Sequence, residues 1–213
     1  MIAIIDYGAG NLMSVQKAFA YIGFDAKITG DAQVIKDASH VVLPGVGSFG
    51  DAMEKLNAAG LYDTIREVIK NGTPFLGVCL GLQLLFTKSE EANDIRGLDI
   101  FVGTSVKIPK VEGLKIPHIG WNNIKFNEKC PLFSGLTGEP YVYFVHSYYV
   151  KPEDKNIVAA TTNYACELFV SFWYKNVFLV QFHPEKSSDV GLTMLKNFAN
   201  LKKGDEVLCT QNG

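Results

Sequence analysis

The chain has 213 residues, enough for one large domain or two small ones, and its 47% hydrophobic and 20% charged residues are typical of a globular protein with a full core. Twenty basic against 22 acidic residues leave a net charge of −2, so the basic surplus of a nucleic-acid-binding protein is missing. The longest apolar stretch, residues 75–86, is too short for a transmembrane helix, and the N-terminus lacks the basic segment of a signal peptide. We therefore expect a cytoplasmic protein that binds neither nucleic acid nor a membrane.

The four cysteines are widely separated and form no C-x-x-C pair. Such spacing favours a reduced protein over a disulfide framework or a zinc site. No His, Cys, Asp or Glu residues show a recognised metal-ligand spacing, so we expect neither a metal nor another cofactor. The cysteines are Cys79, Cys130, Cys166 and Cys209.

Strands and helices alternate in the first half of the chain. Continuous apolar runs predict buried strands, and apolar residues at helical spacing predict helices. In chain order the expected elements are a strand at Ile2–Ile5, a helix over residues 12–22, a strand over 41–43, helices over 52–59 and 61–70, and a strand over 75–78. This alternation predicts a parallel sheet with right-handed crossover connections.

Beyond about residue 98 the chain changes to short β-like runs separated by turn residues. We expect mixed or antiparallel strands here, added to the same body, over residues 141–149, 157–160, 168–173 and 177–182. A last helix over residues 190–201 should bury Leu192, Leu195 and Phe198. The prediction is a single α/β domain over residues 1–201, with a central, mostly parallel sheet flanked by helices, followed by a flexible tail over residues 202–213.

The strongest local signal is the sequence Gly-Val-Cys-Leu-Gly at residues 77–81, between the strand at 75–78 and a predicted helix over residues 82–86. It has the pattern of a nucleophile elbow with cysteine in the central position. Small neighbours allow a strained strand-to-helix turn, and a helix N-terminus favours a thiolate. A buried structural cysteine is the alternative interpretation. The motif makes Cys79 the candidate nucleophile.

A thiol with the ordinary pKa of about 8.5 is mostly protonated at neutral pH, so Cys79 needs a base. His183 follows the apolar strand predicted over residues 177–182 and stands two residues before Glu185. Glu185 can accept a hydrogen bond from the distal ring nitrogen and orient the imidazole, as the third member of a triad does. A solvated His-Pro turn is the alternative, but its coincidence with the elbow favours a triad of Cys79, His183 and Glu185.

The remaining histidines rank below His183 as the base. His118 and His146 have no carboxylate nearby in the sequence, so we expect each to be a hydrogen-bonded structural group or part of a substrate-binding wall. His40 precedes a strand and has no expected role in the chemistry.

The sequence Gly-Val-Gly-Ser-Phe-Gly at residues 45–50 matches the G-x-G-x-x-G pattern of dinucleotide-binding folds. That fingerprint also requires an acidic residue on the next strand, and the strand at residues 75–78 has none. We therefore interpret the match as accidental. A better use of this loop of small residues is to donate backbone N–H groups to an anion.

With these segments in view, the sequence resembles the class I, triad-type glutamine amidotransferases over residues 1 to about 201. The hallmarks are the cysteine elbow and the late His-Pro-Glu. Within the family it is most similar to the glutaminase subunits of imidazole glycerol phosphate synthases. Further matching segments lie at residues 6–11, 44–47, 49–53, 117–122, 143–149 and 181–187.

The resemblance implies the chemistry. Cys79 would attack the side-chain amide carbon of L-glutamine, His183 would protonate the departing ammonia, and water would hydrolyse the thioester to glutamate. Backbone N–H groups would form the oxyanion hole at Val46, Gly47 and Leu80. The groups that hold glutamine would be Gln83, His146, Ser147 and Tyr148.

The resemblance also implies a partner. In this family the ammonia passes to a separate (β/α)8 cyclase subunit, so a heterodimer is expected, with Asn11, Trp121 and Lys186 facing the cyclase. An exposed Trp121 would suit an interface anchor, whereas a core tryptophan beside a glycine turn is the alternative. Similar paralogous glutaminases supply ammonia to sugar-amidating partners in surface polysaccharide or flagellar glycan biosynthesis, and this second pathway stays open.

The sequence departs from the family pattern outside the triad, and the segment at residues 169–173 and the tail from Lys202 are among the less typical parts. Ala165 stands where the family often has glycine after tyrosine, and Leu179 stands where glycine is frequent before the Val-Gln-Phe-His-Pro segment. None of these departures touches the triad, so they bear on the assignment of the acceptor pathway and not on that of the reaction.

Overall fold

The computed structural model describes residues 1–204 and contains a central sheet of eight strands. The strands lie in the order β2-β1-β3-β4-β14-β13-β12-β9. The first five are parallel and the last three join in antiparallel fashion, which confirms the predicted parallel sheet with antiparallel additions. Their bounds are β1 (Ile2–Ile5), β2 (Ala26–Thr29), β3 (His40–Gly45), β4 (Phe75–Cys79), β9 (Lys125–Phe126), β12 (Val158–Tyr164), β13 (Cys166–Tyr174) and β14 (Val177–Val180).

The inner strands β1, β3, β4 and β14 are buried on both faces, which explains their continuous apolar sequences. In β1 the alternation of side chains divides the residues between two cores. Ile2 and Ile4 belong to the core on one face of the sheet, and Ala3 and Ile5 belong to the core on the other face.

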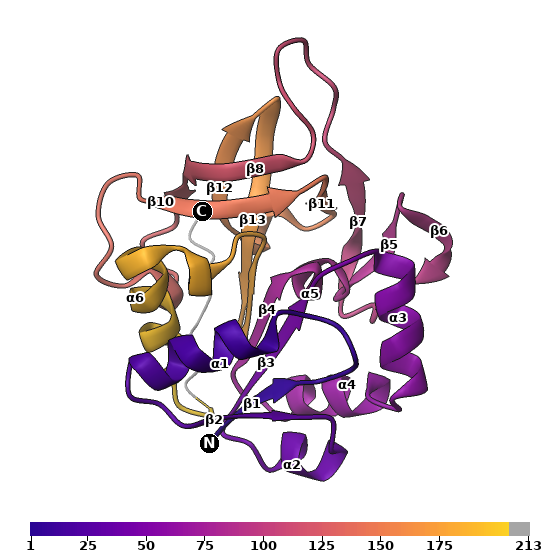
Figure 1. Cartoon of the computed structure of the whole chain (residues 1–213), viewed down its shortest axis with the longest axis vertical. Coiled ribbons are helices and arrows are strands. Elements are labelled where there is room, and N and C mark those ends of the chain that lie inside the picture. Colours follow the sequence, from indigo (N-terminus) through magenta and orange to yellow (C-terminus); the bar gives the residue numbers. More distant parts are fainter. Residues whose placement is uncertain (205–213) are drawn as a thin grey trace.

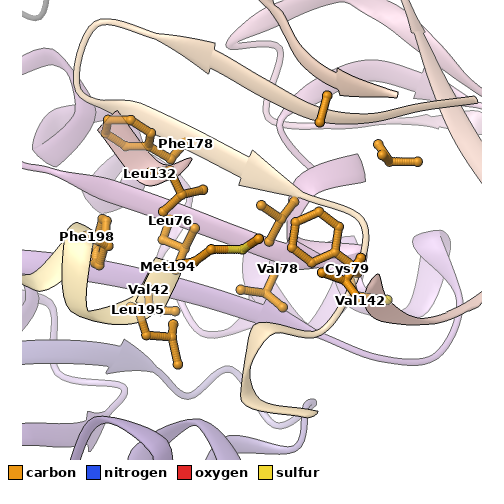
Figure 2. Close-up of a cluster of buried hydrophobic side chains, with 14 of the residues drawn as sticks. Val42, Leu76, Val78, Cys79, Leu132, Val142, Phe178, Met194, Leu195 and Phe198 are labelled. Atoms are coloured by element: carbon orange, nitrogen blue, oxygen red, sulfur yellow. The ribbon is translucent and has the colours of Figure 1, made fainter. Parts of the chain in front are cut away.

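Helices complete both cores (Figure 1). The helices α1 (Leu12–Tyr21) and α6 (Ser188–Ala199) contact each other on one face, and α2 (Ala32–Lys36), α3 (Phe49–Ala58) and α4 (Tyr62–Lys70) cover the other. Figure 2 shows Met194, Leu195 and Phe198 of α6 among apolar side chains of the sheet. Leu195 and Phe198 are buried as predicted, whereas Leu192 is only partly buried and Met194 takes the inward position.

Two smaller sheets stand beside the central one. Four strands lie in the order β11-β7-β5-β6, and β8 pairs with β10 as an antiparallel ribbon. The β-rich part therefore begins at Phe86, earlier than the predicted change near residue 98, and its strands do not all extend one sheet. The bounds are β5 (Phe86–Ser89), β6 (Ala92–Arg96), β7 (Phe101–Lys107), β8 (His118–Asn123), β10 (Tyr141–His146) and β11 (Tyr148–Pro152).

The single strand predicted over residues 141–149 is wrong, because the chain breaks at Ser147 and its two halves enter different sheets. Only His146 and Ser147 interrupt the apolar residues there, and two polar residues do not by themselves indicate that a strand ends. The helix predicted over residues 82–86 is also wrong. The helix α5 (Leu80–Gln83) is a single turn, because the carbonyl groups of Leu84 and Leu85 accept hydrogen bonds from the segment at residues 98–101 instead of continuing a helix.

No helix within residues 1–204 combines the length and apolar composition needed to cross a bilayer. In the same part of the chain, Cys79, Cys130 and Cys166 form no disulfide. The fourth cysteine, Cys209, and most of the predicted tail lie outside the described residues.

Ala165 forms the tip of the hairpin between β12 and β13 with a φ of +62°, a left-handed conformation that costs an L-residue about 1–2 kcal/mol. We expect Ala165→Gly to raise the free energy of unfolding by roughly 0.5–1 kcal/mol, since the relief of strain exceeds the added chain entropy. Urea denaturation measures the change. Ala58→Gly, in the exposed last turn of α3, is the control and should lower stability by a similar amount. Equal losses in both variants would contradict the strain argument.

Candidate active site

The elbow at the end of β4 places Cys79 in a strained turn. Its backbone has a φ of +55° and a ψ of −112°, a combination that few residues other than glycine adopt. A Cβ on Gly81 would lie 1.9 Å from the carbonyl oxygen of Leu43, and one on Gly77 would lie 2.7 Å from Cδ2 of Leu179. Gly81 is therefore required by space, because the blocking atom belongs to the backbone, whereas a Cβ at residue 77 would force the Leu179 side chain to move. Leu179 is paired with Gly77 in the sheet and fills the volume that the glycine leaves.

His183 and Glu185 form a buried pair beside the elbow. Nδ1 of His183 lies 2.8 Å from Oε1 of Glu185, and the two side chains are 3% and 2% exposed. The backbone N–H of His183 donates to the carbonyl of Tyr143, and its carbonyl accepts from the Ser187 hydroxyl. These bonds fix the turn that follows β14 and hold the imidazole in place.

Electrostatics favour a protonated His183. Burial lowers the pKa of its imidazole, but the neighbouring Cys79 and Glu185 together outweigh this effect and raise the pKa to about 10. Nε2 of His183 is buried and has no hydrogen-bond partner among residues 1–204. This nitrogen can therefore donate a proton to the Cys79 sulfur or to a substrate. Cys79 itself is buried to 7% exposure. The arrangement provides a nucleophile, an adjacent proton donor and a carboxylate that orients the donor.

The sulfur opens into a cavity of about 270 Å³. This volume is at the small end for ligand sites, which suits a single amino acid better than a peptide or a dinucleotide. The structure brings every residue predicted for the oxyanion hole and for glutamine binding to this cavity. The predicted residues that line it are Val46, Gly47, Cys79, Leu80, Gln83, His146, Ser147, Tyr148 and His183.

The loop at residues 45–47 passes close to the elbow. A Cβ on Gly45 would lie 2.8 Å from the backbone nitrogen of Gly81 and 2.9 Å from the hydroxyl of Tyr7. Gly47 has a φ of +98°, which favours glycine at the turn that faces the cavity. The small residues of the G-x-G pattern thus allow two backbone segments, the loop at residues 45–47 and the elbow, to lie close together.

His118 and His146 form a chain of neutral rings. His118 Nδ1 lies 3.0 Å from His146 Nε2, and His146 Nδ1 lies 2.9 Å from the carbonyl oxygen of Tyr148. Burial lowers the pKa of His118 to about 4 and that of His146 to about 3. Neither ring can serve as a base of ordinary strength. His118 is hydrogen-bonded to His146, and His146 also lines the cavity, so the two expected roles, structural group and substrate-binding wall, both have a place here.

Two groups at the site were not found from the sequence. Glu91 follows β5 and lines the cavity, and its carboxylate accepts a hydrogen bond from the backbone N–H of Phe49 at 2.7 Å. Tyr7 is 4% exposed, and its hydroxyl has no hydrogen-bond partner among residues 1–204. Burial, together with Cys79 and Asp51, raises the pKa of this phenol well above its ordinary value. These two residues can be recognised only from their neighbours in the folded structure.

The three residues predicted to face a partner occupy two places. Trp121 is 52% exposed, so the core interpretation of this residue is wrong. Its ring meets Tyr143 edge-on with centroids 6.2 Å apart, and Lys186 Nζ lies 5.8 Å from the centre of the same tyrosine ring. Asn11 is separate from this group and lines a small cavity that His183 and Glu185 also line.

Within residues 1–204, no three His, Cys, Asp or Glu side chains are grouped so that they could hold a metal ion.

Comparison with known proteins identifies the family. Residues 3–201 match the family model of class-I glutamine amidotransferases. The imidazole glycerol phosphate synthase subunit HisH of Syntrophotalea carbinolica is 50% identical over 206 residues, covering 94% of this chain and 100% of the relative. The protein of the same name from Moorella thermoacetica is 51% identical and covers 94% of both chains.

Solved structures show the same fold at lower identity. A crystal structure described as a glutamine amidotransferase superposes with a TM-score of 0.72 at 17% identity, covering 93% of this chain and 100% of the other. The structure of PurLQS from Thermotoga maritima gives a TM-score of 0.71 at 17% identity, with coverage of 93% and 97%.

Proposed function

Because this chain belongs to the class I glutamine amidotransferases, we propose that it is the glutaminase subunit of an imidazole glycerol phosphate synthase and acts in histidine biosynthesis. It hydrolyses L-glutamine to glutamate and passes the ammonia to a cyclase subunit. The observation that carries the reaction is Cys79 on a strained elbow beside the buried His183–Glu185 pair, in a cavity the size of an amino acid. The relatives at about 50% identity support the pathway, and no observation favours the sugar-amidating alternative.

The reaction follows from the positions of the groups. The Cys79 sulfur attacks the amide carbon of glutamine and forms a C–S bond. When the C–N bond breaks, the protonated His183 gives its proton to the departing nitrogen, which leaves as ammonia. Water then attacks the thioester while His183 accepts a proton, and the C–S bond breaks to release glutamate. Glu185 stays ionised and stabilises the imidazolium.

The oxyanion of each tetrahedral intermediate requires N–H donors. The N-terminus of the single turn α5 provides the N–H of Leu80, and the loop beside it provides those of Val46 and Gly47. Such a donor contributes about 3–4 kcal/mol to transition-state stabilisation. In the same cavity, the Glu91 carboxylate suits the α-ammonium group of glutamine, and the backbone at Ser147 and Tyr148 suits its carboxylate.

The partner surface lies on the ribbon of β8 and β10. On this ribbon Trp121 pairs with Tyr143, and Ile119 and Tyr141 are 60% and 59% exposed on the same side. We call Ile119, Trp121, Tyr141 and Tyr143 the ribbon surface. Exposed aromatic side chains of this kind are enriched at the centres of interfaces, so the ribbon surface suits a cyclase of the (β/α)8 type in a heterodimer.

Trp121→Ala is expected to weaken cyclase binding by roughly thirtyfold or more, the effect of losing an aromatic anchor. Isothermal titration of the cyclase with each variant measures the dissociation constant. Tyr21→Ala is the matched control, because Tyr21 is 80% exposed at the end of α1, away from the ribbon surface, and should leave the affinity unchanged. Equal effects of the two substitutions would place the interface elsewhere.

Isotope transfer tests the proposed function directly. The chain is mixed with the cyclase, the ribonucleotide substrate, glutamine labelled with ¹⁵N at the amide, and an excess of unlabelled ammonium chloride. The unlabelled ammonia in solution is mostly protonated near neutral pH, and ammonium is not a nucleophile. A working pair of subunits should therefore transfer the glutamine nitrogen to the product without exchange with the nitrogen in solution. Mass spectrometry should find ¹⁵N in the imidazole glycerol phosphate. Product that carries mainly the unlabelled nitrogen, or no product, would refute the proposal.

A further inference from the structure

Gln181 directly follows β14, and its side chain is fully buried beside the nucleophile. One end of its amide lies 3.7 Å from the sulfur of Cys79. The two ends of an amide have opposite effects there, because an N–H donates to a thiolate while a carbonyl oxygen repels it. The orientation of the amide therefore decides whether Gln181 helps or hinders the chemistry.

A backbone carbonyl fixes this orientation. The oxygen of Tyr148 can only accept hydrogen bonds, and it lies 3.3 Å from the side chain of Gln83, so the NH₂ group of Gln83 must face it. The hydroxyl of Ser105, 3.1 Å from the other end of the Gln83 amide, donates to Oε1 and agrees with this assignment. Both amide ends of Gln83 are thereby assigned.

The orientation of the Gln83 amide determines the orientation of the Gln181 amide. The NH₂ group of Gln83 also lies 2.9 Å from the Gln181 amide, so Gln181 must present its oxygen to Gln83. The Nε2 group of Gln181 is then left facing Cys79 Sγ. Three buried side chains thus form a chain of directed hydrogen bonds that ends in an N–H at the sulfur.

We propose that Gln181 is a further catalytic residue, which donates its amide N–H to the Cys79 thiolate, and that Gln83 is a positioning residue that keeps this N–H in place. A hydrogen bond to a charged acceptor is stronger than one between neutral groups, and the buried surroundings strengthen it further. Gln181 has no charge of its own, so its contribution differs from that of the His183 imidazolium. The inference rests on the proposed function in one respect only, namely that the Cys79 thiolate attacks glutamine.

The test is the pH dependence of Cys79 alkylation by iodoacetamide, followed by mass spectrometry of the Cys79 peptide in the full chain. Iodoacetamide reacts with the thiolate and needs no glutamine site. Gln181→Met keeps the length of the side chain and removes the donor. We expect it to move the midpoint of the pH profile upward by about one unit and to slow alkylation about tenfold below the midpoint. The kcat for glutamine should fall by a similar factor with little change in KM.

Two further variants complete the design. Gln181→Glu keeps an oxygen that accepts from Gln83 but presents a second oxygen, in place of the N–H donor, to the sulfur. Its alkylation midpoint should therefore rise at least as far as that of Gln181→Met. This variant also provides the test if Gln181→Met does not fold. Gln16→Met is the matched control, because Gln16 on α1 donates to the Ala26 carbonyl and takes no part in this chain of hydrogen bonds, so it should leave the midpoint unchanged. Wild-type midpoints in both Gln181 variants would overturn the inference. A shifted midpoint in a chain that hydrolyses no glutamine would refute the proposed function alone.

Discussion

Cys79→Ala is expected to lower glutamine hydrolysis by more than about a thousandfold while the fold stays intact. The sulfur is the only nucleophile on the elbow, and alanine fits within the volume of cysteine, so the strained turn has no reason to collapse. Turnover is measured as glutamate release at saturating glutamine, and circular dichroism checks the fold. Cys166→Ala is the control, because this half-buried thiol contacts Tyr149 at 3.8 Å in β11 and should not affect the reaction.

A glutamine analogue with an electrophilic group should accordingly label one peptide, the one that contains Cys79. Residual turnover above about one part in a thousand in Cys79→Ala would contradict the assignment of the nucleophile. Labelling that moves to another cysteine would contradict it too.

Glu185→Gln is expected to reduce turnover strongly, but less completely than His183→Ala. The amide can still accept a hydrogen bond from the ring, yet it no longer favours the imidazolium that forms during the reaction. Turnover of both variants against the wild type, from the same glutamate assay, gives the comparison. Glu54→Gln, an exposed carboxylate on α3, is the control and should be neutral.

The same variant should change the pH profile. The pKa of His183 is raised to about 10, so the imidazolium persists at neutral pH and is lost as pH rises toward that value. Because Glu185 is one of the two groups that raise the pKa, Glu185→Gln should move the alkaline fall in activity to lower pH by roughly one unit or more. An unchanged alkaline limb, together with full turnover, would place the third member of the triad elsewhere.

The chemistry of the elbow was visible in the sequence because its pattern is local, even though the atoms nearest the two glycines belong to the distant residues Leu43 and Leu179. Gly77, Cys79 and Gly81 stand within five residues of chain, and Glu185 reaches His183 across only one intervening residue. The parallel sheet was predictable for a similar reason, since buried strands such as β1 are continuous apolar runs.

The parts that sequence analysis missed depend on contacts between distant segments. The donor at the sulfur needs Gln83, Tyr148 and Gln181 together, and Glu91 reaches the cavity from the turn between β5 and β6. The false helix over residues 82–86 has the same cause. Four of its five residues are apolar, and backbone hydrogen bonds from residues 98–101 end the helix at Gln83, so that β5 begins at Phe86.

The central claim is that this chain is a partnered glutaminase, and one assay tests it most directly. Glutamate release from L-glutamine is measured with the purified chain alone, then with the cyclase, and then with the cyclase and its ribonucleotide ligand. We predict slow hydrolysis by the chain alone and a large increase in the complete mixture. Full-rate hydrolysis by the isolated chain that neither the cyclase nor its ligand changes would contradict the account.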